Sequence, residues 1–297
     1  MKIPYYPGCS LKTTGKNLEV SAIAAAKTLG IEMVEIPKWN CCGTVFSLTE
    51  DDLMHHVAPV RNLLRVQEMS GNGSVDTPNK MVTLCSMCFN TMKSAAGRVS
   101  RNAEDLVKIN SFMNLEEDYK GKVQVLHLLE IIRDMGFDKV KEKVSRPLNG
   151  LSVAPYYGCM LLRPADIGID DPEDPTIGKD LFEALGADVV DNPYKKVCCG
   201  AFHTVNDKSL VADLGYEILT RAQKAGGEAI TTSCPLCAFN LDNRQKEISA
   251  AHPEFKQMPV FYFSQLMALA FGLGEEECMF EGNYVDPRPL LKSKNLL

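Results

Sequence analysis

The sequence contains two pairs of adjacent cysteines, Cys41 with Cys42 in KWNCCGT and Cys198 with Cys199 in KKVCCGA. A single cysteine precedes each pair and a C-x-x-C pair follows it, which gives the spacings C-x31-CC-x42-C-x2-C and C-x38-CC-x34-C-x2-C. The ten cysteines of these two arrays are Cys9, Cys41, Cys42, Cys85 and Cys88, and Cys159, Cys198, Cys199, Cys234 and Cys237. Disulfides do not persist in a reducing compartment, so these thiols predict metal binding or redox chemistry.

The segments around the two arrays are similar to each other. IPYYPGC near the start corresponds to APYYGC, VTLCSMC to TTSCPLC, and KVQVLHLLEII to MPVFYFSQLMAL. The repeat is about 150 residues long, with its seam in DKVKEKVSRPLNG at residues 138–150. We therefore expect two domains, residues 1–148 and residues 149–297.

Within each repeat, short extended runs alternate with helical patterns. Residues 2–6 and 151–157 are such runs, and each is followed by a helical pattern that ends at a glycine. Helices are expected to restart after the cysteine pairs, capped by Thr49 and Asn206. Strands that alternate with helices predict an α/β fold. We expect two similar repeats, each a mostly parallel sheet with flanking helices, related by a pseudo-two-fold axis.

Each cysteine element follows a predicted strand. Parallel α/β folds bind ligands at the carboxyl ends of their strands, so the five cysteines of one repeat should converge at one sheet edge. Pro235 would be the first residue of a helix, and the positive end of that helix favours thiolates at Cys234 and Cys237. We expect two clusters of five thiols that face the interface between the repeats.

Five thiols exceed the ligand set of one zinc ion, which takes four ligands in a closed tetrahedron. Adjacent residues of an extended segment point to opposite faces, so Cys41 and Cys42 would reach two irons of a cluster more easily than one small ion. The glycine after each pair, Gly43 or Gly200, allows close approach of the backbone. A zinc-only scaffold is therefore the weaker interpretation.

Composition limits the possible partners. The chain has 297 residues, of which 45% are hydrophobic and 24% charged, and its net charge is −6. No basic stripe is present that would neutralise phosphates, which argues against a nucleic-acid partner. The most apolar run, MPVFYFSQLMALAFGLG, contains Ser264 and Gln265 and is shorter than the roughly 20 residues of a membrane helix. We expect no transmembrane segment and a cytoplasmic location.

The two arrays resemble the cysteine-rich CCG domains, and two complete arrays in one chain resemble the B subunits of the heterodisulfide reductases of methanogens. The resemblance runs from Tyr5 to about Leu241. It implies that the five cysteines of each domain bind one noncubane [4Fe-4S] cluster. It also implies that both clusters face one substrate, the mixed disulfide of coenzymes M and B that is cleaved in methanogenesis. Because a disulfide needs two electrons, each cluster would deliver one electron and capture one sulfur.

The resemblance also implies an anionic substrate, so basic side chains should lie near the cysteines. Lys12 and Arg163 follow the first cysteine of each array, and Lys195 and Lys196 precede the second CCG. These four are candidate substrate-binding residues, and His203, shortly after the second CCG, is a candidate proton donor. A solvated surface side chain is the more common role for any one of them.

The eleventh cysteine, Cys278, lies outside both arrays in EEECMF. Acidic neighbours raise the pKa of a thiol, so we expect a buried or partner-facing residue there and not a ligand. Residues 275–297 contain Pro287 and Pro289 and show little periodicity, which predicts an extended C-terminal arm.

The sequence lacks the cysteine run of bacterial ferredoxins, a G-x-G-x-x-G motif after a strand, and a Walker A motif. The chain is therefore expected to receive electrons from a small iron–sulfur subunit that in turn contacts a flavin-containing subunit. The alternative is an electron-transfer or anchoring iron–sulfur subunit of a quinone-linked or lactate- or glycolate-oxidising dehydrogenase, because CCG repeats also occur in such complexes. Two complete arrays favour the disulfide reductase.

Overall fold

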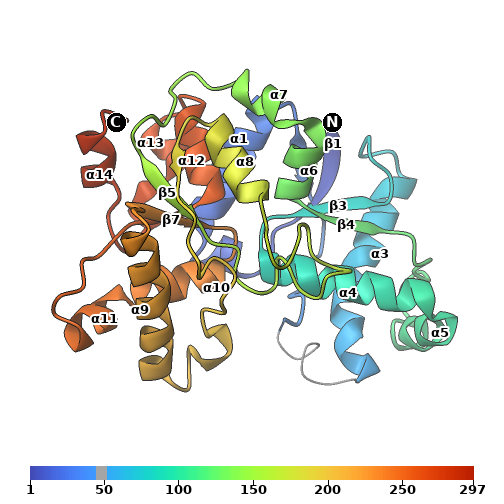
Figure 1. The fold of residues 1–297 in the computed structure, drawn as a ribbon. Coiled ribbons are helices and arrows are strands. Elements are labelled where there is room, and N and C mark those ends of the chain that lie inside the picture. Colours follow the sequence, from blue (N-terminus) through green and yellow to red (C-terminus); the bar gives the residue numbers. More distant parts are fainter. Residues whose placement is uncertain (45–51) are drawn as a thin grey trace.

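The structure is a computed structural model that describes residues 1–44 and 52–297. It consists of two halves that lie side by side, each built around a four-stranded parallel sheet (Figure 1). The strand order is β2-β1-β3-β4 in one sheet and β6-β5-β7-β8 in the other, so the second sheet repeats the topology of the first. The strands are β1 (Lys2–Tyr6), β2 (Glu32–Glu35), β3 (Lys80–Thr83), β4 (Gln124–His127), β5 (Ser152–Pro155), β6 (Asp188–Val189), β7 (Ala229–Thr232) and β8 (Val260–Tyr262).

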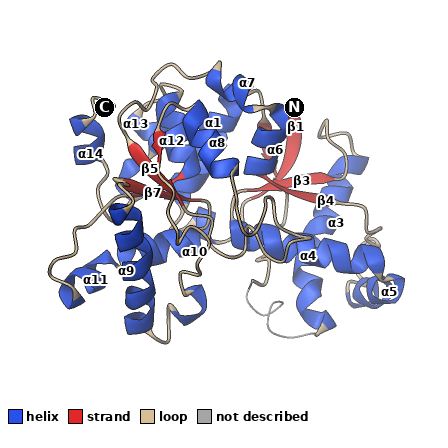
Figure 2. Ribbon diagram, viewed as in Figure 1, coloured by secondary structure: helices blue, strands red, loops and turns tan. Residues whose placement is uncertain are grey.

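Helices connect the strands and cover the sheets (Figure 2). In the first half they are η1 (Ser10–Lys12), α1 (Lys16–Thr28), η2 (Leu53–His56), α3 (Val57–Gly71), α4 (Ser86–Arg101), α5 (Ala103–Phe112), α6 (Leu128–Met135) and α7 (Phe137–Lys141). In the second half they are α8 (Ile177–Ala184), η3 (Ala201–His203), α9 (Lys208–Lys224), α10 (Pro235–Ala238), η4 (Phe239–Asn243), α11 (Gln245–Ala251), α12 (Phe263–Ala270), α13 (Glu275–Cys278), η5 (Phe280–Gly282) and α14 (Arg288–Ser293).

The central strands are buried because helices cover both faces of each sheet, as is usual for parallel sheets. Every residue of β7 is buried, whereas the edge strands β2 and β6 are partly exposed. The predicted α/β fold of two similar parallel-sheet repeats is therefore confirmed. The expected boundary between residues 148 and 149 lies in the segment between α7 and β5.

The two halves are joined by helices that pack across their interface. α1 of the first half packs along α12 of the second, and α8, the counterpart of α1, packs against α6, the counterpart of α12. The small buried residues Ser21, Ala22 and Ala25 on α1 allow close approach. The hydroxyl of Ser21 lies 2.7 Å from that of Ser264 on α12, and the Ser264 hydroxyl also donates to the carbonyl of Leu18 at 3.3 Å. This buried contact fixes the position of one repeat relative to the other.

The C-terminal residues are not the extended arm that the sequence suggested. They form α13, η5 and α14, and their side chains Cys278, Phe280 and Leu291 are fully buried. The carboxylate of Asp242 accepts the backbone N–H groups of Tyr284 and Val285 at 2.8 and 2.9 Å. The sparse apolar residues of this segment were too irregularly spaced to indicate helices, yet they hold it against α12 of the second half and α1 of the first.

The two expected helix caps have different outcomes. The N-cap of α9 is Asp207, whose carboxylate accepts the backbone N–H of Leu210 at 3.0 Å, so the predicted cap at Asn206 is wrong by one residue. The other predicted cap, Thr49, lies outside the described residues. In the part of the chain that the structure describes, no helix combines the length and the apolar character that crossing a membrane requires.

The interface between α1 and α12 should tolerate a small side chain at position 21 and not a large one. The Ser21 oxygen lies only 2.7 Å from the Ser264 oxygen, so the isobutyl group of Ser21→Leu has no room there. We expect this substitution to lower the free energy of unfolding by about 1–3 kcal/mol. Ser21→Ala removes the hydroxyl that bonds both the Asn17 carbonyl and the Ser264 hydroxyl and leaves Ser264 its other acceptor, so its loss should be about 1–2 kcal/mol. Urea denaturation measures both values, and equal stability of Ser21→Leu and the parent would contradict this packing.

Candidate metal centres

The first cysteine array gathers at the carboxyl edge of its sheet, as the order of elements predicted. Cys9 follows β1, and Cys85 is the N-cap residue of α4, directly after β3. Cys42 and Cys88 are buried, with their sulfurs 3.5 Å apart, while Cys9 and Cys41 are exposed and interact through their thiols. The array therefore has a buried side, formed by the C-x-x-C pair and Cys42, and a side open to solvent.

The second array repeats this arrangement. The sulfurs of Cys199 and Cys237 are both buried and lie 3.3 Å apart, and those of Cys159 and Cys198 lie 3.9 Å apart nearer the surface. Cys234 is the N-cap residue of α10, with Pro235 as the first helical residue. Among the described residues, no three Cys, His, Asp or Glu side chains form a group that could hold a single metal ion.

The two arrays meet at the interface between the halves. Cys85 and Cys234 lie near enough to each other for each thiol to shift the pKa of the other, upward for Cys85 and downward for Cys234. The neighbouring hydroxyls of Ser86 and Ser233 lie 2.7 Å apart, and the Ser86 N–H faces the Ser233 carbonyl at 3.4 Å. All four residues are buried. The starts of the two C-x-x-C helices are therefore in contact, and the two candidate centres are neighbours.

The space beside each array suits a group larger than a thiol pair. Gly8 and Gly158 both have positive φ, and a Cβ added at Gly8 would lie only 3.0 Å from the sulfur of Cys88. A Cβ at Gly158 would lie 3.4 Å from the sulfur of Cys237. Glycine at both positions leaves the sulfurs accessible beside the loop that carries the first cysteine of each array. Ten thiols in two arrays, each with a glycine that leaves space beside a sulfur, fit the ligation of iron–sulfur clusters.

Two buried tyrosines complete the arrays, and the sequence did not reveal their role. The Tyr6 hydroxyl donates to the carbonyl of Asn40, directly before the first cysteine pair, at 2.9 Å. Tyr156 donates in the same way to the carbonyl of Val197, before the second pair, at 2.6 Å. Burial and the nearby thiolates raise the pKa of both phenols, so each stays protonated and keeps its bond. The repeated PYY before the first cysteine was the available signal.

Local hydrogen bonds favour the thiolate form at two cysteines. The Cys159 thiol and the Gly200 N–H hydrogen-bond to the sulfur of Cys198 and lower its pKa to about 6. Hydrogen bonding with the thiols of Cys41 and Cys88 lowers the pKa of Cys42 as well. A thiolate is the form that binds metal, so hydrogen bonds in both cysteine pairs favour the ligating form of one sulfur.

The four candidate basic residues are all paired with carboxylates. Lys12 Nζ lies 2.7 Å from both Glu19 and Glu35. In the second half, the partners are Glu173 for Arg163 and Lys196, and Asp174 and Asp191 for Lys195. Five carboxylates thus face four cations, and these side chains create no positive field for an anion.

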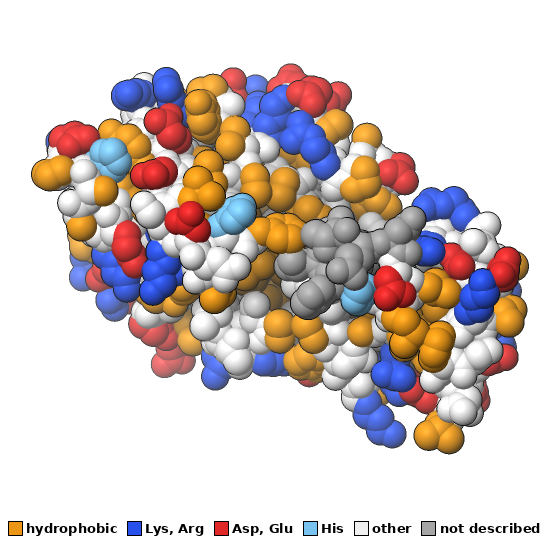
Figure 3. Space-filling view, turned by 90° about the horizontal axis from the view of Figure 1, so that it is seen from below, with side chains coloured by type: hydrophobic (Ala, Val, Ile, Leu, Met, Phe, Trp, Pro, Cys, Tyr) orange, Lys and Arg blue, Asp and Glu red, His pale blue; other side chains and the backbone are white. Residues whose placement is uncertain are grey.

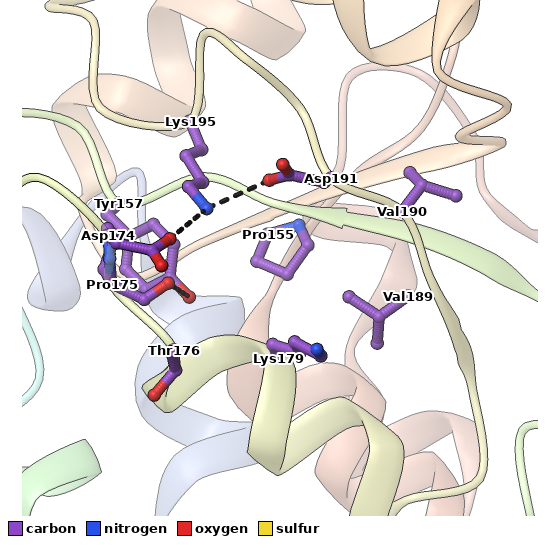
Figure 4. A pocket seen from close by; sticks show the side chains of 10 residues that line it. All are labelled: Pro155, Tyr157, Asp174, Pro175, Thr176, Lys179, Val189, Val190, Asp191 and Lys195. Carbon is purple, nitrogen blue, oxygen red and sulfur yellow. Dashed lines mark hydrogen bonds and ion pairs between the residues drawn. The ribbon is translucent and has the colours of Figure 1, made fainter.

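Lys195 borders a cavity of about 300 Å³ at the carboxyl ends of β5 and β6 (Figure 4). Pro155, Val189 and Val190 form an apolar wall of the cavity. The Lys195 carbonyl accepts the N–H groups of Tyr157 at 2.8 Å and Gly158 at 3.2 Å, directly before Cys159. The backbone of Lys195 therefore supports the cysteine loop.

His203 lies in the turn that follows the second cysteine pair. Its N–H donates to the Gly200 carbonyl at 2.8 Å, and its side chain is exposed. Two apolar neighbours, Phe202 and Val205, are exposed by 45% and 85%. Figure 3 views the molecule from the side of this turn and shows apolar side chains gathered between charged ones. The surface near the second array is therefore partly apolar.

The sequence and the fold together define the class of protein. The model of the cysteine-rich CCG domain matches residues 3–93 and 153–242, which is more than half of the chain. The chain therefore belongs to the CCG cysteine-rich domain family and contains two copies of the domain. The family indicates that the two arrays bind iron–sulfur clusters.

Two relatives match nearly the full length. The chain is 33% identical over 289 residues to the membrane anchor subunit of 8-methylmenaquinol:fumarate reductase of Wolinella succinogenes, covering 96% of this chain and 98% of the relative. It is 27% identical over 292 residues to the B subunit of ferredoxin:CoB-CoM heterodisulfide reductase of Methanosarcina mazei, covering 96% and 94%. The resemblance to heterodisulfide reductase B subunits is confirmed, and both relatives carry names of oxidoreductase subunits.

The fold is similar to that of a solved structure. A hypothetical protein from Helicobacter pylori superposes with a TM-score of 0.71 at 12% identity, covering 96% of this chain. The chain spans about half, 53%, of the length of that protein. At this identity the likeness concerns the fold alone.

The space that Gly8 leaves beside the sulfur of Cys88 can be tested by substituting Gly8, with Gly30 as the control position. Gly8→Ala and Gly30→Ala both place alanine at a positive φ, but Gly30 has open space and Gly8 faces the sulfur of Cys88. Each should lose about 1–2 kcal/mol of stability. Only Gly8→Ala should also lower the iron bound per chain. Equal iron contents in the two variants would show that the space beside Cys88 is not used.

Removal of one buried thiol should affect one centre. We expect Cys42→Ala and Cys199→Ala each to retain about half of the iron of the parent, because each array has its own ligands. Cys278→Ala is the control: this thiol is equally buried, with a pKa raised to about 12 by burial, and it should retain all iron. Iron and acid-labile sulfide assays after anaerobic purification measure the result. Complete loss of iron in either array variant would contradict independent centres.

Proposed function

We propose that this chain is the catalytic subunit of a disulfide reductase, with one noncubane [4Fe-4S] cluster bound by each cysteine array. The observation that carries the proposal is the contact between the starts of the two C-x-x-C helices, where the hydroxyls of Ser86 and Ser233, directly after Cys85 and Cys234, lie 2.7 Å apart, because it makes the two centres neighbours. Bound clusters would supply single electrons, and cleavage of one S–S bond to two thiols consumes two electrons and two protons. Two adjacent centres fit this stoichiometry.

The roles of the chain's own residues follow from their positions. The ten cysteines hold the two groups, and the buried C-x-x-C pairs exclude water from the side where the halves meet. Tyr6 and Tyr156 hold the backbone before the cysteine pairs, so that both thiols of each pair stay at their array. His203 is exposed in the turn after the second pair, where it could deliver one of the two protons.

The charges favour a substrate with few anionic groups. The mixed disulfide of coenzymes M and B, the substrate named by the resemblance, is strongly anionic. Lys12, Arg163, Lys195 and Lys196 would have to release their carboxylate partners to bind it. Exposed ion pairs are weak and can be replaced, but five carboxylates near four cations leave no net attraction for an anion. The mixed disulfide of coenzymes M and B is the substrate that the resemblance implies, whereas the pairing of these four residues favours a disulfide with fewer anionic groups.

A second candidate is an iron–sulfur electron-transfer subunit of a quinol-linked reductase. The relative named as a subunit of 8-methylmenaquinol:fumarate reductase supports it, at 33% identity over almost the entire length of both chains. In either case, the absence of flavin and ferredoxin motifs from the sequence means that electrons arrive through partners. We propose a small iron–sulfur subunit that contacts a flavin-containing subunit.

The half-iron variants separate the two candidates. We expect Cys42→Ala and Cys199→Ala to lose reduction of a small neutral disulfide almost completely, because transfer of one electron from a single centre would leave a sulfur radical that no second centre captures. Turnover is measured anaerobically with reduced methyl viologen as the donor, and Cys278→Ala should keep the activity of the parent. Substantial disulfide reduction by either half-iron variant would contradict the paired mechanism. Transfer to a quinone analogue, with no disulfide reduction by the parent, would favour the second candidate.

A further inference from the structure

The two helices that follow the C-x-x-C pairs differ by one residue. Asn90 comes two residues after Cys88, whereas Asn240 comes three residues after Cys237. The additional residue is accommodated by the π-helical turn η4, which follows α10 directly. Such turns reorient the side chains of a helix and occur frequently at functional sites. The two asparagines are therefore directed to different partners.

Asn240 is directed to the second array. Its side chain is fully buried, and its amide nitrogen lies 3.0 Å from the carbonyl oxygen and 3.6 Å from the sulfur of Cys199. The hydroxyl of Thr204 donates to the amide oxygen of Asn240 at 2.6 Å. Because the oxygen accepts this bond, the NH₂ group must face Cys199. Arg244 donates to the Thr204 carbonyl at 3.1 Å and holds the turn in place.

Asn90 is directed to the other half of the molecule. It is also fully buried, but its amide N–H groups donate to the carbonyls of Met160 at 2.9 Å and Arg163 at 2.6 Å. Both amide N–H groups of Asn90 bond to carbonyls of the loop after Cys159, so neither is directed to a sulfur of the first array. The same residue type thus stabilises the interface between halves at one site and contacts a ligand sulfur at the other.

We propose that Asn240 is a positioning residue that raises the reduction potential of the centre held by the second array. This inference rests on the cluster assignment of the proposed function. Reduction adds one negative charge to an iron–sulfur group, and an N–H donor at a ligand sulfur stabilises that charge in a buried site. Loss of this N–H would therefore lower the reduction potential of a group held by the second array and leave that of the first array unchanged.

The test is a redox titration of the intact, cluster-loaded chain, followed by electron paramagnetic resonance. Asn240→Leu removes the N–H with little change of shape. It should decrease the equilibrium constant for one-electron reduction of one centre about tenfold and leave the other unchanged. The Cys199→Ala variant identifies the transition that belongs to the first array. Gln245→Met is the matched control: it removes another buried amide of the same half, bonded to the Leu241 and Met258 carbonyls, and should shift neither transition.

Thr204→Val provides an independent variant if Asn240→Leu fails to retain the second centre. It leaves Asn240 in place but removes the bond that orients its amide, so it should shift the same transition in the same direction by a smaller factor. The inference would be overturned if both transitions were unchanged in Asn240→Leu, or if both shifted equally. If Asn240→Leu loses the second centre, the absence of a shift in Thr204→Val would overturn it. This titration uses no disulfide substrate. If the parent protein contained no iron, the cluster assignment would be refuted. If the parent contained iron but lacked disulfide reductase activity, this test would still be valid.

Discussion

The contact between the starts of the two C-x-x-C helices is the constraint on which the arrangement of this molecule depends. Ser86 and Ser233, which directly follow Cys85 and Cys234, are in contact there, with their hydroxyls 2.7 Å apart. Because α1 packs along α12 and α6 against α8, neither half can rotate away from this contact without losing a buried helix interface. The duplication therefore produces two centres at a fixed separation, which two independent domains on a flexible linker would not.

The sequence predicted the features that depend on period and spacing. Strands alternating with helices indicated parallel sheets, and the position of each cysteine element after a strand indicated convergence at one edge. Both arrays gather in this way, with buried Cys42 and Cys88 sulfurs 3.5 Å apart in one and Cys199 and Cys237 sulfurs 3.3 Å apart in the other. These features could be predicted because backbone topology alone determines them.

Features that depend on side-chain partners far apart in the sequence could not be predicted. The pairing of Lys195 with Asp174 and Asp191 results from loops that fold over the sheet edge, and nothing in KKVCCGA indicates it. The C-terminal helices form because a few apolar residues find buried positions, not because of a repeating pattern. The different partners of Asn90 and Asn240 follow from a single additional residue, whose effect appears only when the helix turn is known.

The central claim is that each array holds its own multi-iron cluster on one chain. Iron and acid-labile sulfide per chain, measured after anaerobic purification, test it most directly. The account predicts about eight irons and a similar amount of sulfide for the parent protein. Two zinc ions per chain without sulfide would contradict it.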